Sequence, residues 1–239
     1  MKPRAGVALM LVLWIIVVIT TIGSGVFVAT RSNTDITSNY RARVVARYAS
    51  ESGVTLAVAA LQDSLQRLTE ISERRRYLNR LDRALGDRAE VTLGDASFGV
   101  ALIDVGSRLD LNTADGTQLS RLFAFFTDAI AAESAARAIR PFLPLQSVEQ
   151  LREIPDVSRD LAEAAMEFLT VDGDGTINRA SASDTVLTAA GGELRDEPSR
   201  ILVVSRGWLE GHALTHEIQA VYGVVGNELT LIRWRERDL

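Results

Sequence analysis

The feature that most constrains this chain is an uncharged, apolar run at residues 7–30, directly behind a short basic leader. Lys2 and Arg4 are the only charged residues of the leader, and the next charged residue is Arg31. Because a helix rises about 1.5 Å per residue, such a run spans the roughly 30 Å hydrocarbon layer of a bilayer. The sequence therefore predicts one transmembrane helix over residues 7–30, followed by a large second part.

Three kinds of segment share this pattern of charge and hydrophobicity. A secretory signal has a shorter apolar core that ends in a small-residue cleavage site. An uncleaved membrane anchor needs no processing. In the third interpretation the chain is cut after Gly6, because a small residue there suits a membrane peptidase that must accept extended backbone. A cut after Gly6 would leave the whole apolar helix in the mature protein.

The leader resembles that of type IV prepilins and pseudopilins. The resemblance implies that a prepilin peptidase cuts after Gly6 and methylates the new N-terminus, Val7. Most members carry a glutamate at the fifth mature position, and here that residue is Leu11. An apolar residue avoids the cost of burying a carboxylate in lipid. Among pseudopilins, the missing glutamate is the mark of minor pseudopilin K of type II secretion, the GspK family.

Behind the apolar run the chain continues as a predicted amphipathic stem helix over residues 31–68. This segment contains no proline and a single glycine. Apolar or small residues recur every three or four positions, which indicates one apolar helix face. That face comprises Val44, Val45, Tyr48, Ala49, Gly53, Leu56, Ala57, Ala60, Leu61, Leu65 and Leu68. Residues 46–57 resemble the K family, which implies packing with other stems; the alternative is a helix that packs only within its own domain.

The remaining chain begins and ends with segments that predict strands of one sheet. A second helix is expected over residues 69–88, with Arg74 to Arg76 on an exposed face, before a turn at Gly86 and Asp87. Alternating apolar residues then predict strands, because successive strand side chains point to opposite faces. These strands are a hairpin at 90–104 and three runs at 200–209, 213–225 and 228–235. Together they predict one antiparallel sheet laid against the stem helix, an α+β head.

Residues 109–192 have a helical pattern instead. Helices are expected at 115–126, 129–140, 147–153, 159–170 and 184–190. Asn112 and Asn178 stand in similar phrases, and the side-chain oxygens there are expected to cap the helices that follow. Ser147 and Gln150 have the spacing of a capping box.

Residues 151–162 resemble a helix-hairpin-helix, a SAM-like unit that often binds DNA phosphates at a glycine-rich bend. Glycine is required there for close approach to the phosphate, and Asp156 and Ser158 occupy those positions. The net charge of −5 also disfavours nucleic acid. The alternative is a structural insertion, and the K family carries one with the matching phrases Leu-Asn-Thr-Ala and Ser-Val-Glu-Gln-Leu.

The only candidate for metal chemistry is Asp172-Gly-Asp-Gly-Thr, where Asp172 and Asp174 could provide oxygen ligands for calcium. An EF-hand loop also needs a glycine at its sixth position and a glutamate at its twelfth, which are here Ile177 and Ser183. A polar turn is therefore the alternative. The chain has two histidines, no cysteine, and no nucleophile or phosphate-binding motif. We therefore predict that it is not an enzyme, has no cofactor besides possible calcium, and takes no small-molecule substrate.

These patterns combine into one predicted architecture, an α+β pseudopilin fold with an inserted all-helical domain. Its parts are a prepilin leader at 1–6, a transmembrane helix at 7–30, a stem at 31–68, a head from 69–108 and 193–239, and the helical insertion at 109–192.

The resemblance implies a minor pseudopilin at the tip of the periplasmic pseudopilus, which promotes its assembly for protein export across the outer membrane. Its expected partners are minor pseudopilins I and J, the major pseudopilin and the prepilin peptidase. It implies a bacterial inner-membrane protein with a cytoplasmic N-terminus and most of the chain in the periplasm. The alternatives are a minor pilin-like component of a type IV pilus and a membrane-anchored DNA-binding protein.

We expect a Gly6→Leu substitution to stop removal of the leader, because the larger side chain obstructs the backbone at the cleavage point. Mass spectrometry of membrane fractions should find the wild-type chain beginning at Val7 and the variant at Met1. Ala5→Ser is the matched control and should be processed normally. Normal trimming of the Gly6→Leu chain would contradict the cleavage site.

Overall fold

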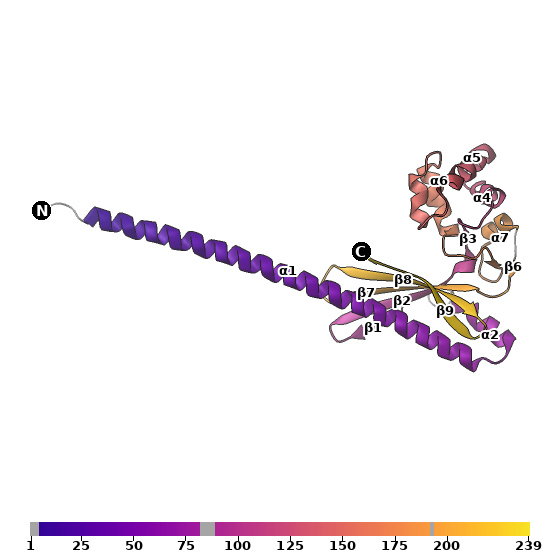
Figure 1. Ribbon diagram of the computed structural model, residues 1–239, viewed down its shortest axis with the longest axis horizontal. Helices are drawn as coiled ribbons and strands as arrows, with labels where there is room; N and C mark the ends of the chain where they lie inside the picture. Colours follow the sequence, from indigo (N-terminus) through magenta and orange to yellow (C-terminus); the bar gives the residue numbers. More distant parts are fainter. Residues whose placement is uncertain (1–4, 82–88, 192–193) are drawn as a thin grey trace.

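The computed structural model describes residues 5–81, 89–191 and 194–239, and Figure 1 shows their arrangement. A single long helix, α1 (Ala5–Arg67), projects from the body at its N-terminal end and lies along a sheet at its C-terminal end. Among the residues described, no helix combines the length and the apolar character needed to cross a membrane.

For some predicted features the structure describes only the backbone, and other predicted features lie outside the described residues. Gly6, Val7 and Leu11 lie in the backbone of α1, but their side chains are outside the described ones. The leader residues before Ala5, the predicted turn at Gly86 and Asp87, and the predicted end of the helical insertion at residue 192 lie outside the described residues.

The sheet has five strands, and each neighbouring pair is antiparallel. They are β1 (Ala89–Leu93), β2 (Ala96–Asp104), β7 (Arg200–Leu209), β8 (Thr215–Val225) and β9 (Glu228–Asp238), in the order β1-β2-β7-β8-β9. This confirms the predicted combination of a helix with an antiparallel sheet. Strand β9 runs past the predicted end at Arg235, because Arg237 and Asp238 still pair with Glu217 and His216 of β8.

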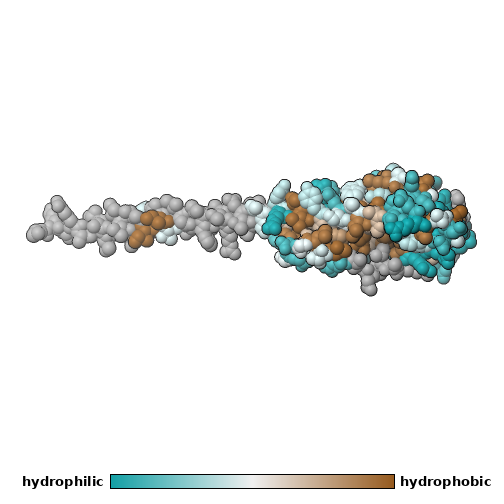
Figure 2. All heavy atoms as spheres, turned by 90° about the horizontal axis from the view of Figure 1, so that it is seen from below, coloured by the Kyte–Doolittle hydropathy of each residue, from teal (hydrophilic) through white to brown (hydrophobic). Residues whose placement is uncertain are grey.

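The sheet packs on a face of α1 that is made mostly of small residues. Its fully buried members are Ala42, Ala46, Ala49, Ser50, Gly53, Val54, Leu61 and Leu65. The predicted face was wrong at Tyr48 and Leu56, which are 64% and 53% exposed. The small side chains are buried because they let the helix approach the sheet, while the larger Tyr48 and Leu56 project outward. Figure 2 shows hydrophobic side chains at the surface among hydrophilic ones on this side of the head.

Two glycines mark where helix and sheet come closest. A β-carbon on Gly207 of β7 would lie 2.3 Å from the carbonyl oxygen of Ala46 and 2.4 Å from the backbone nitrogen of Ser50. A β-carbon on Gly53 of α1 would lie 2.2 Å from Oγ of Ser205 and 2.8 Å from the Phe98 ring. Contact with helix backbone cannot be relieved by turning a side chain, so Gly207 fixes the distance between α1 and β7.

Helix α2 (Ile71–Leu78) is shorter than the predicted second helix. The predicted exposed face of three arginines was wrong at Arg74, because its guanidinium pairs with Glu197 at 3.0 Å and is only 17% exposed. Arg74 also donates to the side chain of Asn227, which precedes β9. Arg74 therefore holds α2 against the loops at one end of the sheet.

The chain between β2 and β7 contains a helical block, defined here as residues 105–191, with a core of its own. Its helices are α4 (Gly116–Phe123), α5 (Ala129–Ile139), α6 (Arg159–Ala165) and α7 (Asp184–Ala190), joined by the 3-10 helices η1 (Val105–Ser107), η2 (Arg140–Phe142), η3 (Val148–Glu153) and η4 (Met166–Phe168). Short parallel strand pairs tie the block together: β3 (Leu109–Asp110) with β4 (Leu169–Thr170), and β5 (Ile177–Asn178) with β6 (Leu194–Arg195).

Three local predictions inside the block need correction. The segment at 147–153 is a 3-10 helix, and the helix predicted to reach residue 170 ends earlier, because Leu169 and Thr170 pair with β3. Asn112 and Asn178 cap no helix; the caps are instead Asp115, Asp128, Ser158 and Ser183. The backbone of Ser147 does donate to Oε1 of Gln150 at 3.2 Å, as the predicted capping box requires.

We expect Gly207→Ala to lower the free energy of unfolding by on the order of 2 kcal/mol, because the added methyl group overlaps the backbone of α1. Urea unfolding of the full chain in a neutral detergent, followed by circular dichroism, measures this loss. Gly116→Ala is the matched control, since nothing lies within 4 Å of the β-carbon position there. Equal stability of the two variants would show that the close contact is not limiting.

Candidate functional site

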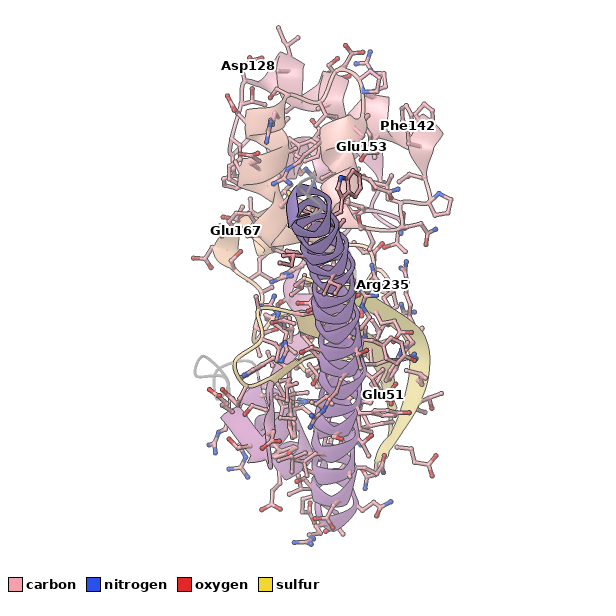
Figure 3. All side chains as sticks on the ribbon, turned by 90° about the vertical axis from the view of Figure 1, so that its left-hand side faces the viewer. Glu51, Asp128, Phe142, Glu153, Glu167 and Arg235 are labelled. Atoms are coloured by element: carbon pink, nitrogen blue, oxygen red, sulfur yellow. The ribbon has the colours of Figure 1, made fainter. Side chains whose placement is uncertain are left out.

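The charges of the head concentrate where β9 faces the helical block, and we call this group the charged seam. It comprises Asp172, Arg206, Glu217, Arg233, Arg235 and Arg237. Strand side chains alternate between faces, so the three arginines at every second position of β9 share one face. Figure 3 looks along α1 and places Arg235 below the block that carries Phe142 and Glu153.

Asp172 is the acceptor on the block side of the seam. Its side chain is 6% exposed, and Arg233 donates from Nη1 to Oδ1 at 3.1 Å. Arg235 donates to the other carboxylate oxygen, so each oxygen of Asp172 has a guanidinium partner. A buried carboxylate needs such partners, because burial of an unpaired charge is costly.

Backbone carbonyl groups of the block complete the seam. Arg235 donates to the carbonyl oxygen of Gln146 at 2.8 Å, and Arg233 donates to the same oxygen at 3.0 Å. On the neighbouring strand β7, Arg200 donates to the carbonyl oxygens of Asp172 at 2.8 Å and Gly173 at 2.7 Å. Three arginines of the sheet thus hold two loops of the block.

Glu217 on β8 is the acceptor on the sheet side and is 1% exposed. Arg206 donates to it at 2.5 Å, Arg237 at 2.7 Å and Gln219 at 2.7 Å. Burial alone would raise the pKa of Glu217, but these hydrogen bonds and the charge of Arg237 outweigh it and lower the pKa below 4.5. The carboxylate is therefore ionised at neutral pH.

A second junction, formed by hydrogen bonds, lies at the far end of β2. Nδ2 of Asn178 donates to Oδ2 of the buried Asp104 at 2.6 Å and to Oδ1 of Asn79 at 2.9 Å. Ser181 also donates to Asp104, and the backbone nitrogen of Gly106 donates to Oδ1 at 2.8 Å. Asn178 therefore joins the sheet, the end of α2 and the block instead of capping a helix.

Asp110 and Asn112 organise the entry into the block. Oδ1 of Asp110 accepts from the backbone nitrogens of Asn112 at 2.7 Å and Thr113 at 2.9 Å, and Oδ2 accepts from Gly173 at 2.6 Å. Burial raises the pKa of Asp110, and these hydrogen bonds offset only part of that effect. Asn112 exchanges two hydrogen bonds with the backbone of Leu145, at 2.7 Å and 3.0 Å. Both side chains thus stabilise loops.

The two aspartates predicted as calcium ligands point to different partners. Oδ1 of Asp174 accepts from the hydroxyl of Thr176 at 2.7 Å, and hydrogen bonds from this threonine help to lower the pKa of Asp174 against the effect of burial. Calcium at Asp172 would have to displace Arg233 and Arg235. Within the described residues, no three His, Cys, Asp or Glu side chains are grouped as a metal site would need. Calcium binding stays a prediction.

His216 ties β9 to β8 near the stem. Its side chain is 8% exposed; Nδ1 lies 2.7 Å from Asp238 and Nε2 lies 3.3 Å from Glu236. Arg43 and Arg47 of α1 pair with the same two acids at 3.0 Å and 3.2 Å. The sequence does not indicate this cluster, because the acids come from a neighbouring strand.

The bend of the helix-hairpin-helix segment has the backbone of a glycine turn without the glycine. Asp156 has a φ of 66°, in the left-handed region that favours glycine. Val157 donates to the carbonyl oxygen of Ile154 at 3.3 Å, which closes the turn. A residue with a carboxylate therefore occupies the left-handed position of this turn.

Comparison with solved structures shows what this fold is similar to. A chain in the crystal structure of the GspK-GspI-GspJ complex from the enterotoxigenic Escherichia coli type 2 secretion system superposes with a TM-score of 0.65. The match covers 86% of this chain and 99% of that one. The chain has the fold of a subunit of this complex. The resemblance to a GspK-like pseudopilin is therefore confirmed at the level of the fold, at 13% sequence identity. By sequence, no family model and no curated protein matches.

We expect the stabilising effect of Glu217 to depend on pH. Because its pKa is lowered in the folded state, its contribution is present above the unfolded value near 4.5 and is lost as the pH falls through the lower folded value. The melting temperature of the wild type should exceed that of Glu217→Gln at pH 7, and the difference should shrink below pH 4.5. Glu133→Gln, at an exposed pair with Arg137, is the control. A difference that is constant with pH would contradict this role.

Proposed function

We propose that this chain is a minor pseudopilin of a type II secretion system. The observation that supports the proposal most directly is the match over 99% of a chain from a pseudopilin complex. The match also covers 86% of this chain. A pseudopilin acts by assembly, so the proposed function is structural and not enzymatic.

The proposed partners are the minor pseudopilins I and J of the same system. The matched complex contains GspK, GspI and GspJ, which supports this choice. The exposed side of α1 also has the character of a contact surface, because Tyr40, Tyr48 and Leu56 are each more than half exposed there. We further propose contacts with the major pseudopilin through the same helix.

The proposal includes a processed membrane anchor. The prepilin peptidase would cut after Gly6, Val7 would be the methylated first residue, and residues 7–30 would lie in the bacterial inner membrane with the head in the periplasm. The uncharged run supports the anchor, because it is long enough to span the hydrocarbon layer. The orientation rests on the resemblance of the leader to that of prepilins.

The most specific part of the proposal is that the chain lies at the tip of the pseudopilus. Leu11 would leave the N-terminal amine of a further subunit without a carboxylate. The helical block lies at the end of the molecule away from the N-terminus of α1 (Figure 1). If α1 runs along the filament, the block would stand above the stem and obstruct the addition of another subunit.

The test is assembly of the full chain with the I and J pseudopilins of its own bacterium. We expect the three chains, co-expressed and extracted in a neutral detergent, to elute together as one complex in size-exclusion chromatography. The minor pilins of a type IV pilus from the same cells serve as the comparison. Exclusive assembly with the pilus proteins would instead support the type IV alternative, and a monomer in both mixtures would contradict the proposal.

A further inference from the structure

The sheet face opposite α1 is not fully covered by the helical block. A cleft of about 280 Å³ remains between them. Its floor consists of Gly99, Ala101 and Ile103 of β2 with Leu202 and Val204 of β7. Their sequence neighbours Phe98, Val100 and Val203 are buried against α1, so strand alternation places the floor on the opposite face. The floor is thus apolar and made of small or branched aliphatic side chains.

The wall of the cleft is charged, with four arginines and three carboxylates. Two carboxylates are already neutralised by the charged seam: Asp172 by Arg235, and Glu217 by Arg206 and Arg237. The remaining arginine is Arg108, between η1 and β3. Its side chain is half-buried and has neither an ion pair nor a hydrogen bond with any residue that the structure describes.

The third carboxylate, Glu149, does not neutralise Arg108. It is exposed at the start of η3. Burial raises its pKa, while hydrogen bonds in its own turn and the charges of Arg237 and Arg235 lower it overall. No ion pair joins Glu149 to Arg108 within the described part of the chain. Arg108 is left as a half-buried cation beside an apolar floor, an arrangement that favours an incoming anion.

We propose that this cleft binds a carboxylate attached to a short aliphatic group, of the kind presented by the C-terminal residue of a peptide. Arg108 would pair with the carboxylate, since a guanidinium matches both carboxylate oxygens at once. The aliphatic group would lie on Ala101, Ile103 and Val204. The chain is acidic overall, so net attraction of an anion at this point is a local property of the cleft.

The test uses two probes that differ only in charge, N-acetyl-L-leucine and N-acetyl-L-leucinamide. Each is titrated into the full chain in a neutral detergent, and methyl NMR signals of Ala101, Ile103 and Val204 report binding. We expect the acid to shift these signals and to bind at least about tenfold more tightly than the amide, because the ionic hydrogen bonds are made only by the acid.

Two variants locate the anion partner. Arg108→Gln should reduce binding of the acid to the level of the amide. Arg67→Gln is the matched control, since Arg67 is exposed on the stem and pairs with Asp63. Equal binding of acid and amide, shifts confined to residues outside the cleft, unchanged affinity in Arg108→Gln, or no binding up to the solubility of the acid would each overturn the proposal.

Discussion

The close contact between α1 and β7 is the constraint on which the rest of the structure depends. Gly207 leaves room for the helix backbone at Ala46, and Gly53 leaves room for Phe98. At that distance only small residues fit on the facing side of the helix, which is why Ala42, Ala46 and Ala49 are buried there. Larger buried side chains lie near the C-terminal end of α1, where Leu61 and Leu65 pack with Ile201 and Leu78. The position of the sheet along the stem follows from this change in size.

The opposite face of the sheet is used differently. On that face the contacts are mainly ion pairs and hydrogen bonds. The arginines of β9 bind Asp172, Glu217 and the carbonyl group of Gln146. Ion pairs and hydrogen bonds of this kind have demanding geometry and leave space between them, whereas apolar side chains fill it. The block is therefore held at its edges, by the charged seam and by Asn178, and the cleft remains between. One face of the sheet thus holds α1 by close packing, and the other holds the helical block by ion pairs and hydrogen bonds.

The sequence predicted those parts of the fold that have a period. The stem and all five strands of the sheet were recognisable from spacings of three to four and of two, because these repeats reflect which side of an element is buried. Spacing does not reveal size requirements, so Tyr48 and Leu56 were placed on the wrong face. It also does not reveal long-range polar partners: Asn112 and Asn178 have the composition of caps but bond to Leu145 and Asp104. The alternating arginines at 233, 235 and 237 were a readable signal that one strand face is charged, but their acceptors come from distant parts of the chain.

Separate cores explain how the fold persists at low sequence identity. The block has its own buried cluster, around Leu122, Ile139 and Leu151, while the sheet and stem share others. The cluster of the block shares no residue with the clusters of the sheet and stem, so the block can change its core residues at constant volume. In this chain the sheet has a small-residue contact on one face and a set of directed bonds on the other. A chain with 13% identity can therefore superpose over nearly the full length of its neighbour, because the constraints concern size and bonding geometry and leave most residue identities open.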